Sequence, residues 1–205
     1  MGRGSLPGPS RVWPLCDCDR PAGARRSHLR RERIEEFSDP GQFDYLVASL
    51  SLHHVEDLGR VLVKIADLLR AGGTLLVVEF AWDWIDEATA EWALKRLPAS
   101  SPSEKPSWSG RCCWEWARGG QGGTRAPAES YFAEWADEKG FHSPWRMCDE
   151  LGRRFVERLF EWVPYLYSDL GEGVSESDER PAIEAGTINA TGFRYVGIRR
   201  ALAEP

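Results

Sequence analysis

The sequence lacks several features that would place it in a special class of protein. No apolar run reaches the roughly 18 residues of a membrane-spanning helix, and the first residues lack the apolar core of a secretory signal peptide. Acidic residues outnumber basic ones by 32 to 26, so the net charge is −6 and the positive surplus that phosphate contacts need is missing. We therefore expect a cytoplasmic protein that binds neither membranes nor nucleic acid.

Cysteine is too scarce and too irregularly spaced to form a recognisable metal or redox motif. The 5 cysteines make an odd number. Neither Cys16-Asp-Cys18 nor Cys112-Cys113 has the spacing of a C-x-x-C pair or of a zinc site. We therefore expect free thiols and no metal. Tryptophan is abundant instead, with 10 copies that fall almost entirely beyond residue 80, and their bulk predicts a core or an apolar pocket there.

One stretch has the pattern of a strand, a helix and a second strand. Phe43 to Leu50 is nearly continuous in apolar residues, as expected for a parallel strand that is covered on both faces. Asp57 is a good N-cap for a helix whose apolar residues recur every three or four positions from Leu58 to Leu69. Gly72-Gly73 is expected to end that helix, and Thr74 to Phe80 to form a second buried strand. Such a unit predicts an α/β fold with parallel strands.

The rest of the chain gives weaker patterns. Pro98 to Pro127 is expected to be a long loop, because Ser, Pro and Gly dominate it. The remaining ranges predict helices at Asp83 to Leu97, Ser130 to Lys139, Met147 to Arg154 and Glu176 to Ala185, and strands at Phe155 to Tyr167 and Gly192 to Arg199.

The segment FDYLVASLSLHHVEDLGRVLVKIADLLRAGGTLLVVEF resembles the fourth strand, the following helix and the fifth strand of class I S-adenosylmethionine-dependent methyltransferases. The resemblance rests on Phe43-Asp44 at the start of the strand, on a loop with two histidines, and on a turn ending in Gly72-Gly73, where Ala71 replaces the usual Pro. It implies a Rossmann-like doubly wound sheet, here incomplete, with a helical, Trp-rich C-terminal part. It also implies S-adenosyl-L-methionine as cofactor and a small-molecule methyl acceptor.

The same resemblance suggests residues that bind the cofactor. Ile34 and Glu35 match the position where a backbone amide and an acidic side chain hold the adenine. Ser49 and Leu50 match the strand end that contacts the methionine part, and His54 is expected beside them.

Other candidates rest on the edge of the sheet where ligands of open parallel sheets bind. His53 and His54 are open to two interpretations, one in which a neutral imidazole orients or deprotonates the substrate, and one in which they only cap the loop. Glu79 is either a carboxylate at the edge of the core or a catalytic group. Trp82 and Trp84, just beyond the second strand, are candidates for substrate binding.

The sequence departs from this family before residue 32. Two features of the family are missing there. One is the Gly-rich loop that lets the backbone approach the cofactor closely, and the other is the acidic residue after the family's second strand. Residues 1–31, rich in Gly, Pro, Arg and Ser, are expected to be a disordered tail or GC-rich DNA translated out of frame. Our hypothesis is a gene that starts upstream and shifts frame between Arg26 and Glu32, which leaves open whether this chain is active.

Three regions and three functions follow. We expect the tail at 1–31, a partial methyltransferase core at 32–97, and an insertion or cap with the terminal strands of the same domain at 98–205. The leading function is methyl transfer to a small molecule. The alternatives are a non-catalytic remnant that pairs with a partner or with its own copies, and a nicotinamide-dependent oxidoreductase. The last is disfavoured because no G-x-G-x-x-G follows a strand.

Overall fold

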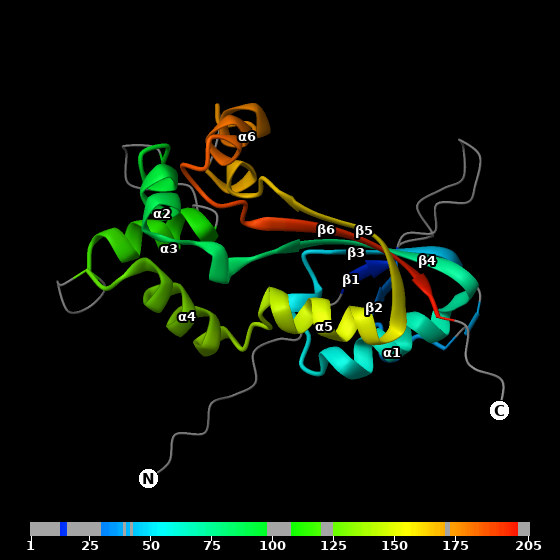
Figure 1. The fold of residues 1–205 in the computed structure, drawn as a ribbon. Helices are drawn as coiled ribbons and strands as arrows, with labels where there is room; N and C mark the ends of the chain where they lie inside the picture. Colours follow the sequence, from blue (N-terminus) through cyan, green and yellow to red (C-terminus); the bar gives the residue numbers. More distant parts are fainter. Residues whose placement is uncertain are drawn as a thin grey trace, which may run out of the picture.

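The computed structural model describes residues 13–15, 30–38, 40–41, 43–97, 108–119, 125–170 and 173–200. Their secondary structure alternates between strands and helices, which confirms the predicted α/β class (Figure 1). In chain order the elements are β1 (Trp13–Leu15), β2 (Arg30–Glu32), β3 (Phe43–Ser49), η1 (Leu52–His54), α1 (Leu58–Leu68), β4 (Leu69–Phe80), η2 (Trp82–Trp84), α2 (Glu87–Leu94), α3 (Trp108–Ala117), α4 (Ala128–Lys139), α5 (Pro144–Arg154), β5 (Phe155–Val163), η4 (Leu166–Asp169), α6 (Glu176–Glu184) and β6 (Gly192–Arg199).

The main sheet has four strands in the order β3-β4-β6-β5. β3 and β4 are parallel neighbours joined by α1, as the sequence predicts, with Val47 beside Leu76 and Ala48 beside Val77. The terminal strand β6 lies between β4 and β5 and runs antiparallel to both. The last strand of the chain therefore enters the sheet beside β4, and β5 becomes one edge.

Helices α1 and α5 pack on the same face of this sheet (Figure 1). Asp57 caps α1 by accepting the backbone N–H of Arg60, and the apolar side of α1 is buried against the strands. The expected helix end at Gly72-Gly73 is wrong, because α1 ends at Leu68 and Leu69 already has an extended backbone. Leu69 is fully buried and starts β4, so tertiary packing ends the helix before the glycines do.

A second hydrophobic core lies beyond the carboxyl ends of β3 and β4. It joins α2, α3, α4, η4 and α6, which gather at one end of the sheet in Figure 1. The expectation of a loop over Pro98–Pro127 is wrong for α3, since Cys113 and Trp116 are buried in this core and stabilise a helix. The helix expected from Asp83 starts only at Glu87, where the Asp86 side chain accepts the N–H of Thr89. The remainder of 98–127 is outside the described residues apart from 118–119 and 125–127.

The other face of the sheet carries exposed apolar side chains. Tyr45 and Val47 are 68% and 69% exposed, although both lie in the middle of β3. Strand register aligns them with residues of the other strands in two rows, which we call the open face. The rows are Val47, Leu76, Val196, Leu159 and Tyr45, Thr74, Ile198, Val156.

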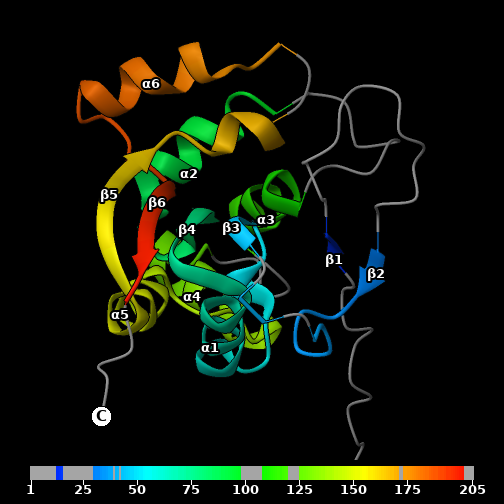
Figure 2. The ribbon, with the colours of Figure 1, turned by 90° about the vertical axis from the view of Figure 1, so that its right-hand side faces the viewer.

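Two short strands lie within or at the end of the segment for which the sequence predicts no regular structure. β1 and β2 pair antiparallel, and Figure 2 shows these two strands to the side of β3. The expected disorder of the rest of 1–31 lies outside the described residues.

Candidate functional site

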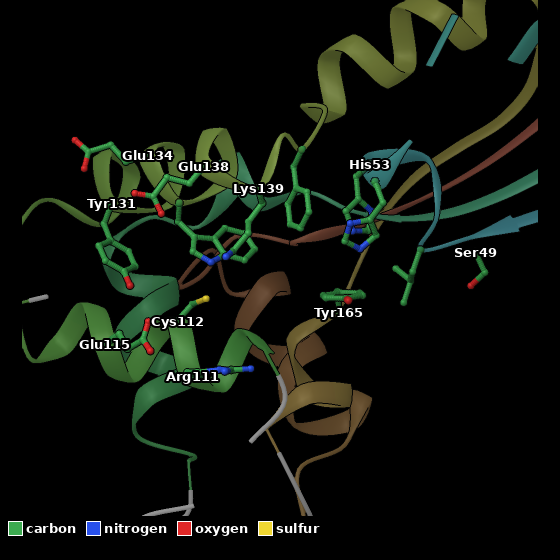
Figure 3. A pocket seen from close by; sticks show the side chains of 14 residues that line it. Ser49, His53, Arg111, Cys112, Glu115, Tyr131, Glu134, Glu138, Lys139 and Tyr165 are labelled. Carbon is green, nitrogen blue, oxygen red and sulfur yellow. The ribbon is translucent and has the colours of Figure 1, made fainter. Parts of the chain in front are cut away.

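A cavity of about 860 Å³ lies where the carboxyl end of β3 meets the helical part of the chain. Its volume falls within the range of sites for small ligands, about 300–1,000 Å³. One wall comes from the end of β3 and from η1, and the opposite walls come from α3, α4 and the residue before η4 (Figure 3). The lining residues are Ser49, Leu50, His53, His54, Arg111, Cys112, Glu115, Tyr131, Glu134, Trp135, Glu138, Lys139, Phe141 and Tyr165.

Leu50 marks the sheet side of the cavity with an unusual backbone. Its φ is 49°, in the left-handed region that a branched aliphatic side chain rarely adopts. The N–H of Leu50 still donates to the carbonyl of Val78 at 2.8 Å, so the chain leaves the sheet immediately after this bond. Strained residues of this kind cluster at binding sites, where the surrounding structure holds them in place.

The buried carboxylate of Glu79 holds the loop that follows β3. Oε1 accepts the backbone N–H groups of Ser51 at 2.7 Å and Leu52 at 2.6 Å. Oε2 lies 2.5 Å from Nδ1 of His53 and also accepts the N–H of Phe80 at 3.2 Å. Glu79 is fully buried at the end of β4, and His53 is only 4% exposed. A residue of one strand thus fixes the loop of its neighbour at the cavity wall.

One side of α4 contributes alternating aromatic and acidic groups. Tyr131, Glu134, Trp135 and Glu138 are spaced three and four residues apart, so they share one face of the helix. Glu115 approaches from α3, opposite Glu134 and Glu138 in Figure 3. Burial, followed by the nearby thiols and carboxylate, raises the pKa of Tyr131 to about 12, and its hydroxyl bonds to Glu115. Tyr131 therefore stays protonated at neutral pH.

The thiols beside this wall are not activated. Burial raises the pKa of Cys112 to about 12, and burial with the neighbouring Cys112 raises that of Cys113 to about 12. Both are free cysteines, as is Cys148, so the predicted free thiols are confirmed for the three described cysteines. Since the thiolate is the nucleophile, neither Cys112 nor Cys113 suits covalent catalysis.

A second buried carboxylate positions Tyr165, which also lines the cavity and lies near His53 in Figure 3. Glu179 of α6 accepts the backbone N–H groups of Tyr165, Leu166 and Tyr167 at 3.0, 3.3 and 2.7 Å. Burial raises the pKa of Glu179, while these three bonds act in the opposite direction. The arrangement mirrors that of Glu79, because each carboxylate binds successive amides of a segment that lines the cavity.

The structure brings together only part of the predicted site. Ser49, Leu50, His53 and His54 all line the cavity. Ile34 lies instead at a second hollow of about 100 Å³ beside β3, and Glu35 lines neither.

The tryptophans proposed for substrate binding also lie outside the cavity lining. Trp82 donates its indole N–H to the carbonyl of His142, and Trp84 packs against Trp145 and Trp162. Sequence reasoning missed Tyr165, Trp135 and the α3 residues. The helical spacing of Tyr131 to Glu138 was a usable signal, whereas nothing local marks Tyr165.

Two further findings concern expected absences. Within the part of the chain that the structure describes, no group of three or more His, Cys, Asp or Glu residues is placed to hold a metal ion. No described helix has the length and the apolar character needed to cross a membrane.

Residues 16–77 match the family model described as "Methyltransferase domain". The match includes β3, α1 and most of β4, and it begins inside the segment that the frame-shift hypothesis assigns to foreign sequence. No curated protein sequence matches the chain.

The solved structures that resemble this chain include several methyltransferases. An S-adenosylmethionine dependent methyltransferase from Mesorhizobium loti is 16% identical, with a TM-score of 0.45 over 83% of this chain and 68% of its own. A geranyl diphosphate C-methyltransferase from Streptomyces coelicolor A3(2), with S-adenosyl-L-homocysteine bound, is 13% identical, with a TM-score of 0.43 over 83% of this chain and 52% of its own. The N-methyltransferase NodS from Bradyrhizobium japonicum is 11% identical, with a TM-score of 0.42 over 84% of this chain and 54% of its own. The chain thus spans between about half and two thirds of these proteins.

The family match confirms the class that the motif around the two histidines indicates. Residues 16–77 of this chain are therefore similar to part of a methyltransferase domain.

The charged and aromatic side chains of the cavity suit the parts of S-adenosylmethionine. Carboxylates of Glu115, Glu134 and Glu138 suit its positive charges, Arg111 suits its carboxylate, and aromatic rings such as Tyr165 suit its adenine and sulfonium.

Proposed function

We propose that this protein transfers the methyl group of S-adenosylmethionine to a small-molecule acceptor bound in the cavity. The observation that carries the proposal is the position of the cavity. The cavity opens at the carboxyl end of β3, and this strand end belongs to the segment that matches the methyltransferase domain. In open parallel sheets this edge is where ligands bind. Bound here, the cofactor supplies an electrophilic methyl group on a positively charged sulfur.

The residues of the chain would position the two reactants. Ser49, Leu50 and His54 at the sheet side would hold the methionine part of the cofactor, as the family resemblance implies. The rings of Trp135, on α4, and Tyr165, before η4, would pack on the adenine and the sulfonium of the cofactor and exclude water from the acceptor beside it. Such positioning converts a bimolecular step into an effectively unimolecular one and supplies much of the rate enhancement.

Calorimetric titration with S-adenosylmethionine and S-adenosylhomocysteine tests this function. We expect saturable binding of both, and at least a severalfold weaker binding by Trp135→Ala, because its ring lines the cavity. Trp114→Ala is the matched control, since Trp114 is 40% exposed on α3 and does not line the cavity. Absence of binding by the unaltered chain, or equal loss in both variants, contradicts the proposal. Fluorescence with a reduced nicotinamide cofactor tests the oxidoreductase alternative.

A second candidate function is pairing with a second copy of the chain, and the open face favours it. β3 is the other edge of the four-stranded sheet, and its exposed residues suit self-pairing. Two β3 strands placed antiparallel about Leu46 bring Tyr45 opposite Val47 of the partner subunit. Aromatic and β-branched residues stabilise each other in such cross-strand pairs by about 0.2–1 kcal/mol. No like charges are opposed in this register, because Asp44 faces Ala48 of the partner subunit.

Sedimentation velocity separates this candidate from a monomer. We expect a dimer that Val47→Lys disrupts and Val63→Lys does not, because Val63 is 46% exposed on α1, away from the sheet edge. A monomer at high protein concentration, or disruption by both variants, rules out the pairing.

A further inference from the structure

We propose that His53 is the general base of the methyl transfer, and that Glu79 is the positioning residue that fixes the proton of His53 on Nδ1. The proposal rests on the proposed function and assigns roles within the same cavity. It chooses between the two interpretations that the sequence leaves open for His53.

The tautomer of His53 follows from the bonds that Glu79 makes. Both oxygens of Glu79 already accept backbone N–H groups, from Ser51 and Leu52 on Oε1 and from Phe80 on Oε2. A carboxylate in this role is an acceptor, so the 2.5 Å contact to His53 is a donation from Nδ1–H. In a neutral imidazole the other nitrogen, Nε2, then carries the free electron pair.

The setting of the ring suits a base better than a loop anchor alone. His53 lines the cavity while its side chain is only 6% exposed, so the ring is held between the protein and the ligand site. His54 packs against it with ring centroids 3.9 Å apart, and Phe141 contacts it edge-on at 5.0 Å. Its position is therefore fixed by packing and by Glu79 before an acceptor binds. The titratable groups around it are Glu79 from β4, His54 from η1 and His142 from the link between α4 and α5.

A hydroxyl or amine nucleophile loses a proton during the methyl transfer, and a general base takes up that proton. The acceptor's heteroatom forms a bond to the methyl carbon while the carbon–sulfur bond breaks and its electron pair returns to sulfur. The heteroatom then loses its proton to Nε2 of His53, and the imidazolium is stabilised by the Glu79 carboxylate. The proton leaves to solvent after product release. A carboxylate oriented on the far nitrogen of a histidine plays this part in other general-base sites.

Nitrogen NMR of protein labelled at histidine tests the positioning role without cofactor. The His53 signals, assigned by their loss in His53→Asn, are expected to show a protonated Nδ1 and a bare Nε2. Glu79→Gln presents an amide N–H to the ring and is expected to reverse the tautomer. A protonated Nε2 in the unaltered protein overturns the proposal. That spectrum alone decides if Glu79→Gln does not fold.

Acylation by diethyl pyrocarbonate gives a second readout, because the reagent attacks the bare nitrogen of a neutral imidazole. We expect His53 to react. Glu79→Gln should slow this reaction by at least about tenfold, because Nε2 then carries the proton; general-base effects on rates are usually larger than this. His142 is an internal reference whose reaction rate should be the same in both proteins. It does not line the cavity, and its buried Nε2 has no hydrogen-bond partner among the described residues. An unreactive His53, or an equal rate in Glu79→Gln, contradicts the proposal.

Turnover tests the base itself, followed as S-adenosylhomocysteine released with catechol and phenethylamine as trial acceptors. His53→Asn is expected to lower kcat by about 10²-fold or more, with an acid limb in the pH profile that only the unaltered protein shows. Cofactor affinity should be unchanged. Equal kcat in both proteins overturns the base role. If the unaltered protein binds no cofactor, the proposed function fails, whereas the tautomer of His53 is still decided by NMR.

Discussion

The carboxylate of Glu179 accepts the backbone N–H of Tyr165 at 3.0 Å, and so links α6 to a residue that lines the cavity. The two residues are 14 positions apart, and both are buried. Together with the bonds to Leu166 and Tyr167, this contact sets where the ring of Tyr165 lies.

Glu179→Gln is expected to lower the free energy of unfolding by about 1–3 kcal/mol, because one of the amides would face an N–H group in place of an oxygen. Binding of S-adenosylhomocysteine should weaken as well, since Tyr165 loses its support. Urea denaturation and calorimetry measure the two effects. Glu176→Gln is the control, because Glu176 pairs with Arg180 at the surface and such pairs contribute little. Similar losses in the two variants would contradict the role of Glu179.

Asp83 predicts a pH dependence of stability. Burial raises its pKa from 3.8 to about 6, and Oδ1 is buried without a hydrogen-bond partner among the described residues. A raised pKa in the folded state means that the stabilising contribution is complete below pH 3.8 and is lost as pH rises to about 6. At pH 7 the charged side chain therefore destabilises the fold.

Asp83→Asn is accordingly expected to stabilise the protein at pH 7 by roughly 1–2 kcal/mol, a value reduced for the partial exposure of the side chain. The difference from the unaltered protein should shrink between pH 6 and pH 4. Thermal unfolding across this range measures it. Asp137→Asn, on the exposed side of α4, should show no such trend. A constant difference at all pH values would refute the prediction.

Two glycines predict opposite effects of the same substitution. A Cβ at Gly197, on β6, would lie 2.6 Å from the Tyr195 ring and 2.8 Å from Cβ of Phe155, closer than packed atoms allow. Gly197→Ala is expected to destabilise by about 1–3 kcal/mol through overpacking. A Cβ at Gly152, inside α5, meets nothing within 4 Å, so Gly152→Ala should stabilise by up to about 1 kcal/mol. Denaturant unfolding of both variants decides, and equal signs would contradict the packing of β6.

Cys113 provides a test of the second core. It is fully buried on α3, and burial raises its pKa to about 12. Iodoacetamide at pH 8 is therefore expected to modify Cys113 at least about 100-fold more slowly in the folded protein than in urea, because reaction requires a thiolate. Mass spectrometry of the peptides measures each cysteine separately. Rapid modification of the folded protein would show that α3 does not pack as described.

The sequence by itself determined the parts of this protein whose signals are local. The sequence predicted β3, α1 and the parallel neighbour β4 from the apolar run at Phe43, the cap at Asp57 and the helical repeat that follows. These patterns can be recognised because the residues that a strand or helix buries lie close together in the sequence. The same pattern, with its two histidines, indicated the methyltransferase class that the family match confirms.

Only the tertiary structure decided what depends on residues far apart in the chain. Glu79 and His53 are 26 residues apart, and no spacing rule connects a strand end to the loop of its neighbour. α3 forms in a stretch whose composition favours a loop, because Cys113 and Trp116 gain a core that other segments supply. The cavity likewise has one wall from the predicted sheet and others from helices of the second half, so its chemistry exists only once the two hydrophobic cores have packed together.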